Sequence, residues 1–347
     1  MKEKKYNVIY HKVKDKILSG EYKAGSKLPS KRVMSDLTGF SQITVATAYD
    51  TLASEGYIVS RERSGYYVCE IDGFVKEKHP NYNLSLLPEE DIVEEVGLET
   101  SVWFKTIRKV LTDRDEKLFV KSPNKGCAVL RNAISEYLYR YRGMIAEPRR
   151  IIIGSGAEQL YESVVKILGR DKVFGIENPG YGQIKAVYEG EGVKVQQLNL
   201  GEDGIDSAEL DKEFDVLHVT PFNSYPTGVT TSVSKRYIYL KWAKEGKYIV
   251  EDDFDSEFFL PGHPIESLYS LDKEQRVVYI NTFSKSLSPS MRMGYMILPE
   301  VLLSVYEEKL GKYSCTVPVL DQYVLAEFIS SGNFERHLNR VRRRMKR

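Results

Sequence analysis

Between residues 151 and 280 the chain alternates short apolar runs with longer segments of helical periodicity. Continuous apolar runs are typical of strands that are buried on both faces. Strands that alternate with helices favour a mostly parallel sheet covered by helices. We therefore predict an α/β domain here, with strands at 151–153, 173–176, 193–198, 216–219, 248–250 and 277–280.

A lysine and an arginine follow the last of these runs. Hydroxyl residues flank Lys285, and Arg292 lies seven positions later. A lysine at a strand end can be desolvated, which lowers the pKa of its amine and lets it form a Schiff base. Hydroxyl groups and an arginine suit a phosphate. The segment therefore suits pyridoxal 5'-phosphate, which is held by its aldehyde and its phosphate, although a solvated loop could have the same composition.

Three other strand ends carry groups that would complete such a site. The glycine turn 154–156 can offer backbone N–H groups and a helix N-terminus to a phosphate, or be a tight connection that binds nothing. Tyr181 can stack on a flat ring or pack within its turn. The acidic run 251–253 can keep a pyridine nitrogen protonated, or be a solvated loop or a metal site, and the metal is disfavoured because no cysteine or histidine cluster is near. Ligands bind at the carboxyl ends of such strands, so we expect these groups to converge.

The first seventy residues predict a separate winged helix-turn-helix. Helical spacing at 6–19 is followed by two segments that begin after the capping residues Ser30 and Ser41 and then by a hairpin at 57–68. The residues expected to point inward from the second and third helices are Val33, Met34, Leu37, Val45, Tyr49 and Leu52.

This motif places the N-terminal residues of its second helix in the major groove and its wing on the DNA backbone. Residues 1–70 hold twelve Lys or Arg against eight Asp or Glu, a charge of +4 that suits DNA, whereas the whole chain has +1. A small helical dimerisation domain remains the alternative. Base edges or phosphates are expected to meet Gln42, Thr44 and Thr47, and phosphates alone Lys31, Arg32, Arg61 and Arg63.

The composition favours the cytoplasm. The three cysteines are far apart and odd in number, which predicts neither a disulfide framework nor a zinc site. No apolar run approaches the ~20 residues of a membrane helix, and the N-terminus lacks the apolar core of a signal peptide. We expect a cytoplasmic protein with no membrane partner and no metal.

A set of positions within 6–68 follows a known pattern: Gly20, Gly25, Leu28, Pro29, Ser30, Arg32, Ser41, Thr44, Val45, Ala48, Tyr49, Leu52, Glu55, Gly56, Tyr57, Ser64 and Gly65. In these positions the chain resembles the DNA-binding domain of the GntR family of bacterial regulators, which implies a double-stranded DNA operator as partner. Gln42 stands where the family often has arginine. Glutamine pairs with adenine rather than guanine, so we expect the operator to differ.

A second set follows another pattern: Pro123, Gly126, Leu130, Arg131, Tyr137, Leu138, Arg142, Gly143, 154–156, 179–181, Thr220, Pro221, 226–228, 251–253, 255–258, 282–285, Arg292, Gly294 and Tyr295. In these positions the chain resembles the fold-type-I aminotransferases, and most closely the MocR group, which fuses that fold to a GntR-type DNA-binding domain. The resemblance implies that Lys285 binds the cofactor's aldehyde, that Asp252 pairs with its ring nitrogen and that Tyr181 stacks on its ring. It implies a homodimer, and a phosphate held by Ser155, Gly156, Ala157, Thr282 and Arg292.

Phe254 and the chain's end depart from the MocR group, and Tyr225 departs from the plain aminotransferases. Phe254 cannot donate to the cofactor's ring oxygen as the group's tyrosine does. Tyr225 replaces the asparagine of plain aminotransferases, which is normal for the regulators. The group continues into a small C-terminal domain, whereas this sequence stops at the basic residues 340–347, which suggest the start of an interrupted helix. We therefore expect a winged helix-turn-helix DNA-binding domain at 1–69, a linker at 70–83, and at 84–347 an aminotransferase-like domain without the small C-terminal subdomain.

The favoured hypothesis is a transcriptional regulator that senses pyridoxal phosphate or its adduct with a small amine or amino acid. One alternative is a working aminotransferase with a DNA-binding appendage, whose turnover is disfavoured by the missing segment. The other is a degenerate protein that binds DNA and no cofactor.

Overall fold

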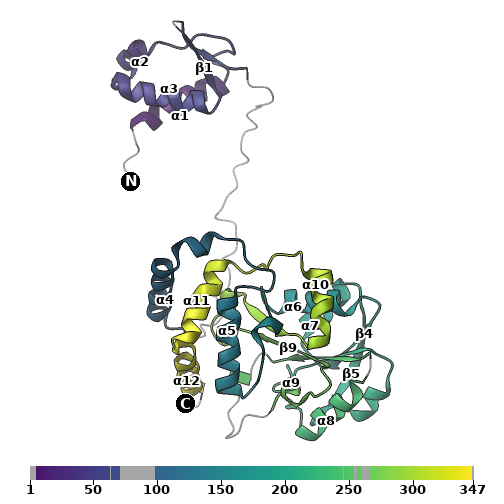
Figure 1. The fold of residues 1–347 in the computed structure, drawn as a ribbon. Helices are drawn as coiled ribbons and strands as arrows, with labels where there is room; N and C mark the ends of the chain where they lie inside the picture. Colours follow the sequence, from purple (N-terminus) through teal and green to yellow (C-terminus); the bar gives the residue numbers. More distant parts are fainter. Residues whose placement is uncertain are drawn as a thin grey trace. The chain divides into compact units, whose positions relative to one another are not determined.

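The computed structural model describes residues 5–62, 64–70, 98–244, 246–253, 256–258 and 266–345. The chain divides into two compact units, Met1–Ile92 and Val93–Arg347 (Figure 1). Arg63, Phe254 and the expected linker beyond Glu70 lie outside the described residues.

The small unit has the three helices and the hairpin that the sequence predicts. The side chain of Ser30 accepts a hydrogen bond from the backbone of Val33 (3.2 Å), and that of Ser41 accepts one from the backbone of Thr44 (3.3 Å), so both predicted caps are confirmed. The two strands pair antiparallel. The elements are α1 (Lys5–Leu18), α2 (Lys31–Thr38), α3 (Gln42–Ser54), β1 (Ile58–Arg61) and β2 (Gly65–Val68).

The core of the small unit confirms the prediction for α3 and corrects it for α2. Val45, Tyr49 and Leu52 are fully buried, and Met34 on α2 is 5% exposed. Val33 and Leu37, also expected inward, are 47% and 69% exposed. They lie one turn apart on the stripe next to Met34, and apolar spacing does not show which of two adjacent stripes is covered.

The large unit is built on an eight-stranded sheet of order β3-β10-β9-β8-β7-β4-β5-β6. The strands β9, β8, β7, β4 and β5 pair in parallel, as predicted. β10 runs antiparallel between β3 and β9, and β6 runs antiparallel at the edge. The strands are β3 (Ile151–Gly154), β4 (Val173–Asn178), β5 (Lys194–Gly201), β6 (Gly204–Ile205), β7 (Val216–Val219), β8 (Tyr248–Asp252), β9 (Val277–Thr282) and β10 (Gly294–Ile297).

Helices cover both faces of this sheet. Alternate residues of β9 show the division, since Tyr279 packs in one apolar cluster with α5, α11 and α12 and Ile280 packs in another with α6, α7 and α10. The two groups of helices lie apart in Figure 1. The helices are α4 (Thr100–Asp113), α5 (Ala128–Tyr137), α6 (Ala157–Leu168), α7 (Gly182–Gly190), α8 (Val233–Trp242), α9 (Leu268–Leu271), α10 (Leu303–Leu310), α11 (Val319–Ser330) and α12 (Asn333–Met345).

The basic end of the chain is helical up to Met345, within α12. In the part of the chain that the structure describes, no helix is long and apolar enough to cross a bilayer.

Candidate functional site

A cavity of about 460 Å³ opens where strands of the large sheet end. Its wall includes the last residues of β8 and β9, residues that follow β4 and β7, and the first turn of α6. Six of the eight predicted cofactor residues line it: Ala157, Tyr181, Asp252, Thr282, Lys285 and Arg292.

Of the acidic run at the end of β8, Asp252 is the residue that lines the cavity. Successive side chains of a strand point to opposite faces, so Asp252 shares a face with Val250, while Glu251 and Asp253 point to the other. All three are buried, which excludes a solvated acidic loop. Among the described residues no group of three or more histidines, cysteines or carboxylates could hold a metal.

The two acids on the other face have structural partners. Glu251 accepts hydrogen bonds from the backbone N–H groups of Leu268 and Tyr269, both at 2.8 Å. Asp253 forms an ion pair with Arg142 (2.9 Å) and accepts the hydroxyl of Tyr279 (2.6 Å). Burial and the charge of Asp253 raise the pKa of Glu251 to about 7. Glu251 and Asp253 therefore belong to a buried polar network with a structural role on the other face of the sheet.

The Asp252 carboxylate is held by a network that sequence analysis missed. Its Oδ2 accepts a hydrogen bond from the Tyr161 hydroxyl and lies 3.6 Å from Nε2 of His218. His218 in turn bonds the Tyr188 hydroxyl through Nδ1 (2.6 Å). Burial and the Asp252 charge raise the pKa of Tyr161 well above its ordinary value, so this phenol stays protonated and donates a hydrogen bond to Asp252. A histidine inside the apolar run 216–219 was the signal that could have revealed the network.

The other oxygen of Asp252, Oδ1, is buried and has no hydrogen-bond partner among the described residues. A buried carboxylate oxygen without a partner is energetically costly. Because Asp252 lines the cavity, a donor bound there would remove this cost.

Lys285 lies in the turn after β9 and lines the same cavity as Asp252. A lysine at this strand end could be desolvated, but residue 285 is exposed in this structure.

The turn between β3 and α6 lies beside Arg292. Gly156 is the residue before α6 and has φ of 97°, and a Cβ at this position would lie 3.3 Å from Nη2 of Arg292. Arg292 has a left-handed backbone, with φ of 41°, and forms an ion pair with Glu158 in the first turn of α6. Gly156 and Ser155 themselves are outside the cavity lining, and the Ser155 hydroxyl bonds that of Thr316 (2.9 Å).

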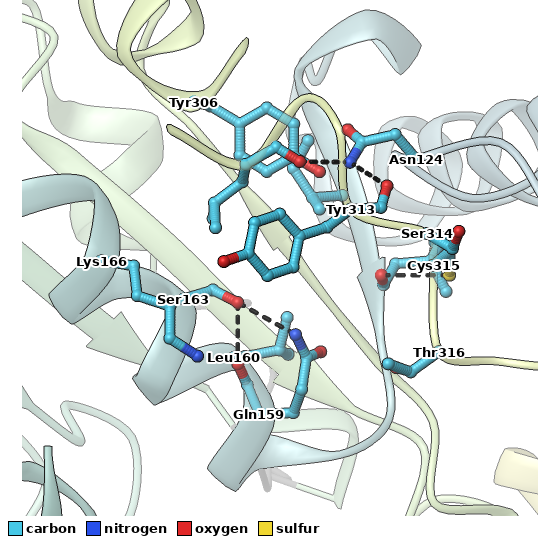
Figure 2. Close-up of a pocket in the computed structure, with 13 residues that line it drawn as sticks. Asn124, Gln159, Leu160, Ser163, Lys166, Tyr306, Tyr313, Ser314, Cys315 and Thr316 are labelled. Atoms are coloured by element: carbon cyan, nitrogen blue, oxygen red, sulfur yellow. Dashed lines mark hydrogen bonds between the residues drawn. The ribbon is translucent and has the colours of Figure 1, made fainter. Parts of the chain in front are cut away.

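A second, smaller cavity of about 70 Å³ lies behind this turn. Figure 2 shows Gln159 at its edge, with its amide nitrogen donating to the Ser163 hydroxyl (3.0 Å). The amide oxygen of Gln159 accepts the backbone N–H of Ser155 (3.3 Å). Gln159 thus holds the turn in place.

Tyr181 stands at the rim of the main cavity. Its ring is half-exposed and meets the Tyr225 ring edge-on, with 6.0 Å between the centroids and an angle of 87°. The face of the Tyr181 ring is therefore not stacked on that neighbour, and Tyr225 lines the cavity with it.

The predicted DNA-contact residues of the small unit differ in their surroundings. Gln42, Thr47 and Arg32 are exposed, and Lys31 is half-buried with its ammonium 5.2 Å from the centre of the Tyr66 ring. Arg61 lies over the ring of Tyr67 in the hairpin, 4.5 Å from its centre.

The start of α3 also carries a threonine that takes part in the helix cap and an exposed isoleucine. Thr44 is half-buried and its hydroxyl bonds that of Ser41 (2.9 Å), so it is engaged in the helix cap. Ile43, which sequence analysis did not consider, is 80% exposed.

Comparisons with known proteins agree for both units. The family described as "Bacterial regulatory proteins, gntR family" matches residues 5–68. Over 97% of its length the chain is 34% identical to the HTH-type transcriptional regulator YdeL of Bacillus subtilis, of which it covers 76%. Over 96% of its length it is 28% identical to the probable rhizopine catabolism regulatory protein MocR of Rhizobium meliloti, of which it covers 73%.

The large unit has the aminotransferase fold. The crystal structure of LysN, the α-aminoadipate aminotransferase of Thermus thermophilus, complexed with N-(5'-phosphopyridoxyl)-L-leucine, matches with a TM-score of 0.63 and 28% identity. The match covers 71% of this chain and 64% of that enzyme, so the chain spans less than two thirds of its length.

Proposed function

The chain belongs to the MocR-type subgroup of the GntR family of bacterial transcriptional regulators, and we propose that its aminotransferase-like unit binds pyridoxal 5'-phosphate and uses it to sense a small amine or amino acid. The small unit then binds a double-stranded operator, and the ligand state of the large unit sets how tightly. The proposed place of action is the cytoplasm.

The residues around the main cavity fit the cofactor. Asp252 would accept a hydrogen bond from the ring nitrogen, Lys285 would bind the aldehyde, and Tyr181 would offer its ring face. The phosphate would be held by the backbone of Gly156 and Ala157 at the start of α6 and by Thr282 and Arg292. The Ser155 hydroxyl accepts a hydrogen bond from Thr316 and would keep its own proton to donate to the phosphate.

The observation that carries this proposal is the buried, unpartnered Oδ1 of Asp252 in the cavity that Lys285 also lines. A protonated pyridine nitrogen is the donor that such an oxygen suits, and a carboxylate there keeps the nitrogen protonated. When bound, the cofactor supplies an aldehyde that condenses with amines and a ring that withdraws electrons. The chain's own part is to hold the ring, the phosphate and the lysine in one place.

Tyr161 and His218 support this assignment from behind Asp252. Both approach Oδ2 of the carboxylate, so they orient it and leave Oδ1 toward a ligand. Such support is what a carboxylate needs to remain charged in a buried position.

Regulation requires that two operator half-sites respond to the large unit. We propose a homodimer, because two DNA-binding units at a fixed spacing bind paired half-sites and a change in their spacing changes the affinity for the operator. An amine that competes with Lys285 for the aldehyde would alter the contacts of that lysine and so bias the dimer.

The test uses the full chain and a fluorescent duplex that the chain itself has selected from randomised DNA. We expect the apparent Kd for this duplex to change when pyridoxal 5'-phosphate is added and to change again with a series of amines and amino acids. Lys285→Ala should bind the duplex and show neither response. Equal responses in Lys285→Ala, or none in the wild type, contradict the proposal.

The aminotransferase fold itself favours a second candidate function, turnover of an amino donor. Steady formation of keto acid by the full chain, lost in Lys285→Ala, would identify an enzyme. A regulator gives at most one equivalent.

A further inference from the structure

The recognition helix α3 begins with an exposed isoleucine. Ile43 is its second residue and is 80% exposed, while Val45 and Leu52 of the same helix are fully buried. Folding of the small unit therefore leaves this side chain almost wholly in water. In a winged helix-turn-helix the first turn of this helix is the part that reaches base edges.

The neighbours of Ile43 offer few hydrogen-bond donors to a base. Thr47, one turn along the same stripe, donates its hydroxyl proton back to the carbonyl of Ile43 (3.0 Å). Thr44 is engaged with Ser41 in the cap. Within the first turn this leaves Gln42 as the polar reader and Ile43 as an apolar one beside it.

The helix is also uncharged where it would enter the groove. From Gln42 to Tyr49 it carries no acidic or basic side chain. Among the described residues, the cations predicted to contact phosphates are Lys31, Arg32 and Arg61, which lie on α2 and in the hairpin. Base reading at α3 therefore depends on shape and apolar contact as well as on Gln42.

One apolar group is presented by the standard bases in the major groove, the C5-methyl group of thymine. We propose that Ile43 packs against a thymine methyl in each operator half-site and makes the chain prefer thymine at that position. Gln42 pairs well with adenine, so the two neighbouring residues together favour an A·T-rich step. This inference rests on DNA binding by the small unit and is independent of the cofactor.

The experiment removes only the methyl group. The full chain selects a duplex from randomised DNA, and each thymine of that duplex is replaced in turn by deoxyuridine. We expect wild-type affinity to fall at one thymine per half-site, by roughly fourfold, the effect of losing one buried methyl-sized group. Ile43→Ala should bind more weakly and be insensitive to deoxyuridine at that position alone.

Val8→Ala is the matched control, because Val8 is an exposed aliphatic residue on α1, outside the reading helix. It should keep the wild-type sensitivity, and circular dichroism should show all three proteins folded. A wild type that is indifferent to every deoxyuridine overturns the contact. A normal DNA profile in Ile43→Ala with an altered oligomeric state overturns it too, and assigns Ile43 to self-association. A wild type that selects no sequence overturns operator reading itself.

Discussion

Glu158 forms an ion pair with Arg292 in the wall of the main cavity. Arg292 is the residue proposed to hold the cofactor's phosphate, and Glu158 lies in the first helical turn beside it. A carboxylate at this position competes with a phosphate for the same guanidinium.

We predict that Glu158→Gln binds pyridoxal 5'-phosphate more tightly, by roughly two- to fivefold, as expected for an exposed charge pair. The measurement is a fluorescence titration of the full chain. Glu162→Gln, one turn further along α6 and paired with Lys166 (3.2 Å), is the control and should leave the Kd unchanged. Weaker binding in Glu158→Gln would mean that Glu158 positions Arg292 instead of competing.

Asp252→Ala should bind the cofactor roughly ten- to a hundredfold more weakly, because it removes a hydrogen bond to a charged group. The fold should persist, since the variant also removes a buried charge. The same titration measures the Kd, and thermal unfolding checks the fold. Asp253→Asn should instead leave the cofactor Kd unchanged and lower the stability of the chain, because it breaks the buried ion pair with Arg142. Equal cofactor affinities for Asp252→Ala and the wild type would remove Asp252 from the site.

Glu257 gives a prediction for pH. Burial and the charge of Asp253 raise the pKa of its carboxyl to about 7 from an ordinary 4.5, while Asn281 donates to Oε1 (2.9 Å). Between these two pH values the folded chain binds more protons than the unfolded chain. The contribution of Glu257 to the free energy of unfolding is therefore fully present below about pH 4.5 and is lost as the pH rises towards 7.

Glu257→Gln cannot ionise and should lose the share of this dependence that Glu257 contributes, while the share of Glu251, whose pKa is also raised to about 7, remains. Relative to the wild type we expect it to gain stability on the order of 1–3 kcal/mol between pH 5 and pH 8. Thermal unfolding at a series of pH values measures the difference, with Glu116→Gln, an exposed carboxylate, as control. A difference that does not change with pH would show that Glu257 is ionised throughout.

Arg61→Ala should weaken binding to all DNA sequences alike and lower the salt dependence of log Kd by about one unit, because Arg61 is assigned to a phosphate. The measurement is fluorescence anisotropy at several salt concentrations with the selected duplex and with random DNA. Arg61→Lys, which keeps the charge, should retain most of the slope. A loss confined to the selected duplex would assign Arg61 to a base.

Local signals in the sequence predicted the small unit well. Ser30 and Ser41 cap their helices because a cap depends on three or four consecutive residues. The burial of Val33 and Leu37 was mispredicted, since it depends on which stripe of α2 other elements cover. Ile43 was overlooked because an exposed apolar residue leaves no mark on the periodicity.

In the large unit the strand ends predicted which residues meet, and their roles remain proposals. Parallel strands bring Asp252 and Thr282 to one edge whatever the loops between them. The place of β10 between β3 and β9 depends on long-range pairing that no short segment specifies. The exposure of Lys285 and the ring of partners around Asp252 likewise depend on tertiary packing.

Peptide mapping of the full chain, after incubation with pyridoxal 5'-phosphate and reduction with borohydride, tests most directly whether the cavity binds the cofactor through its lysine. The account predicts one phosphopyridoxyl group on the peptide that contains Lys285, absent from Lys285→Ala. A label spread over other lysines, or a wild-type chain with none, would contradict it.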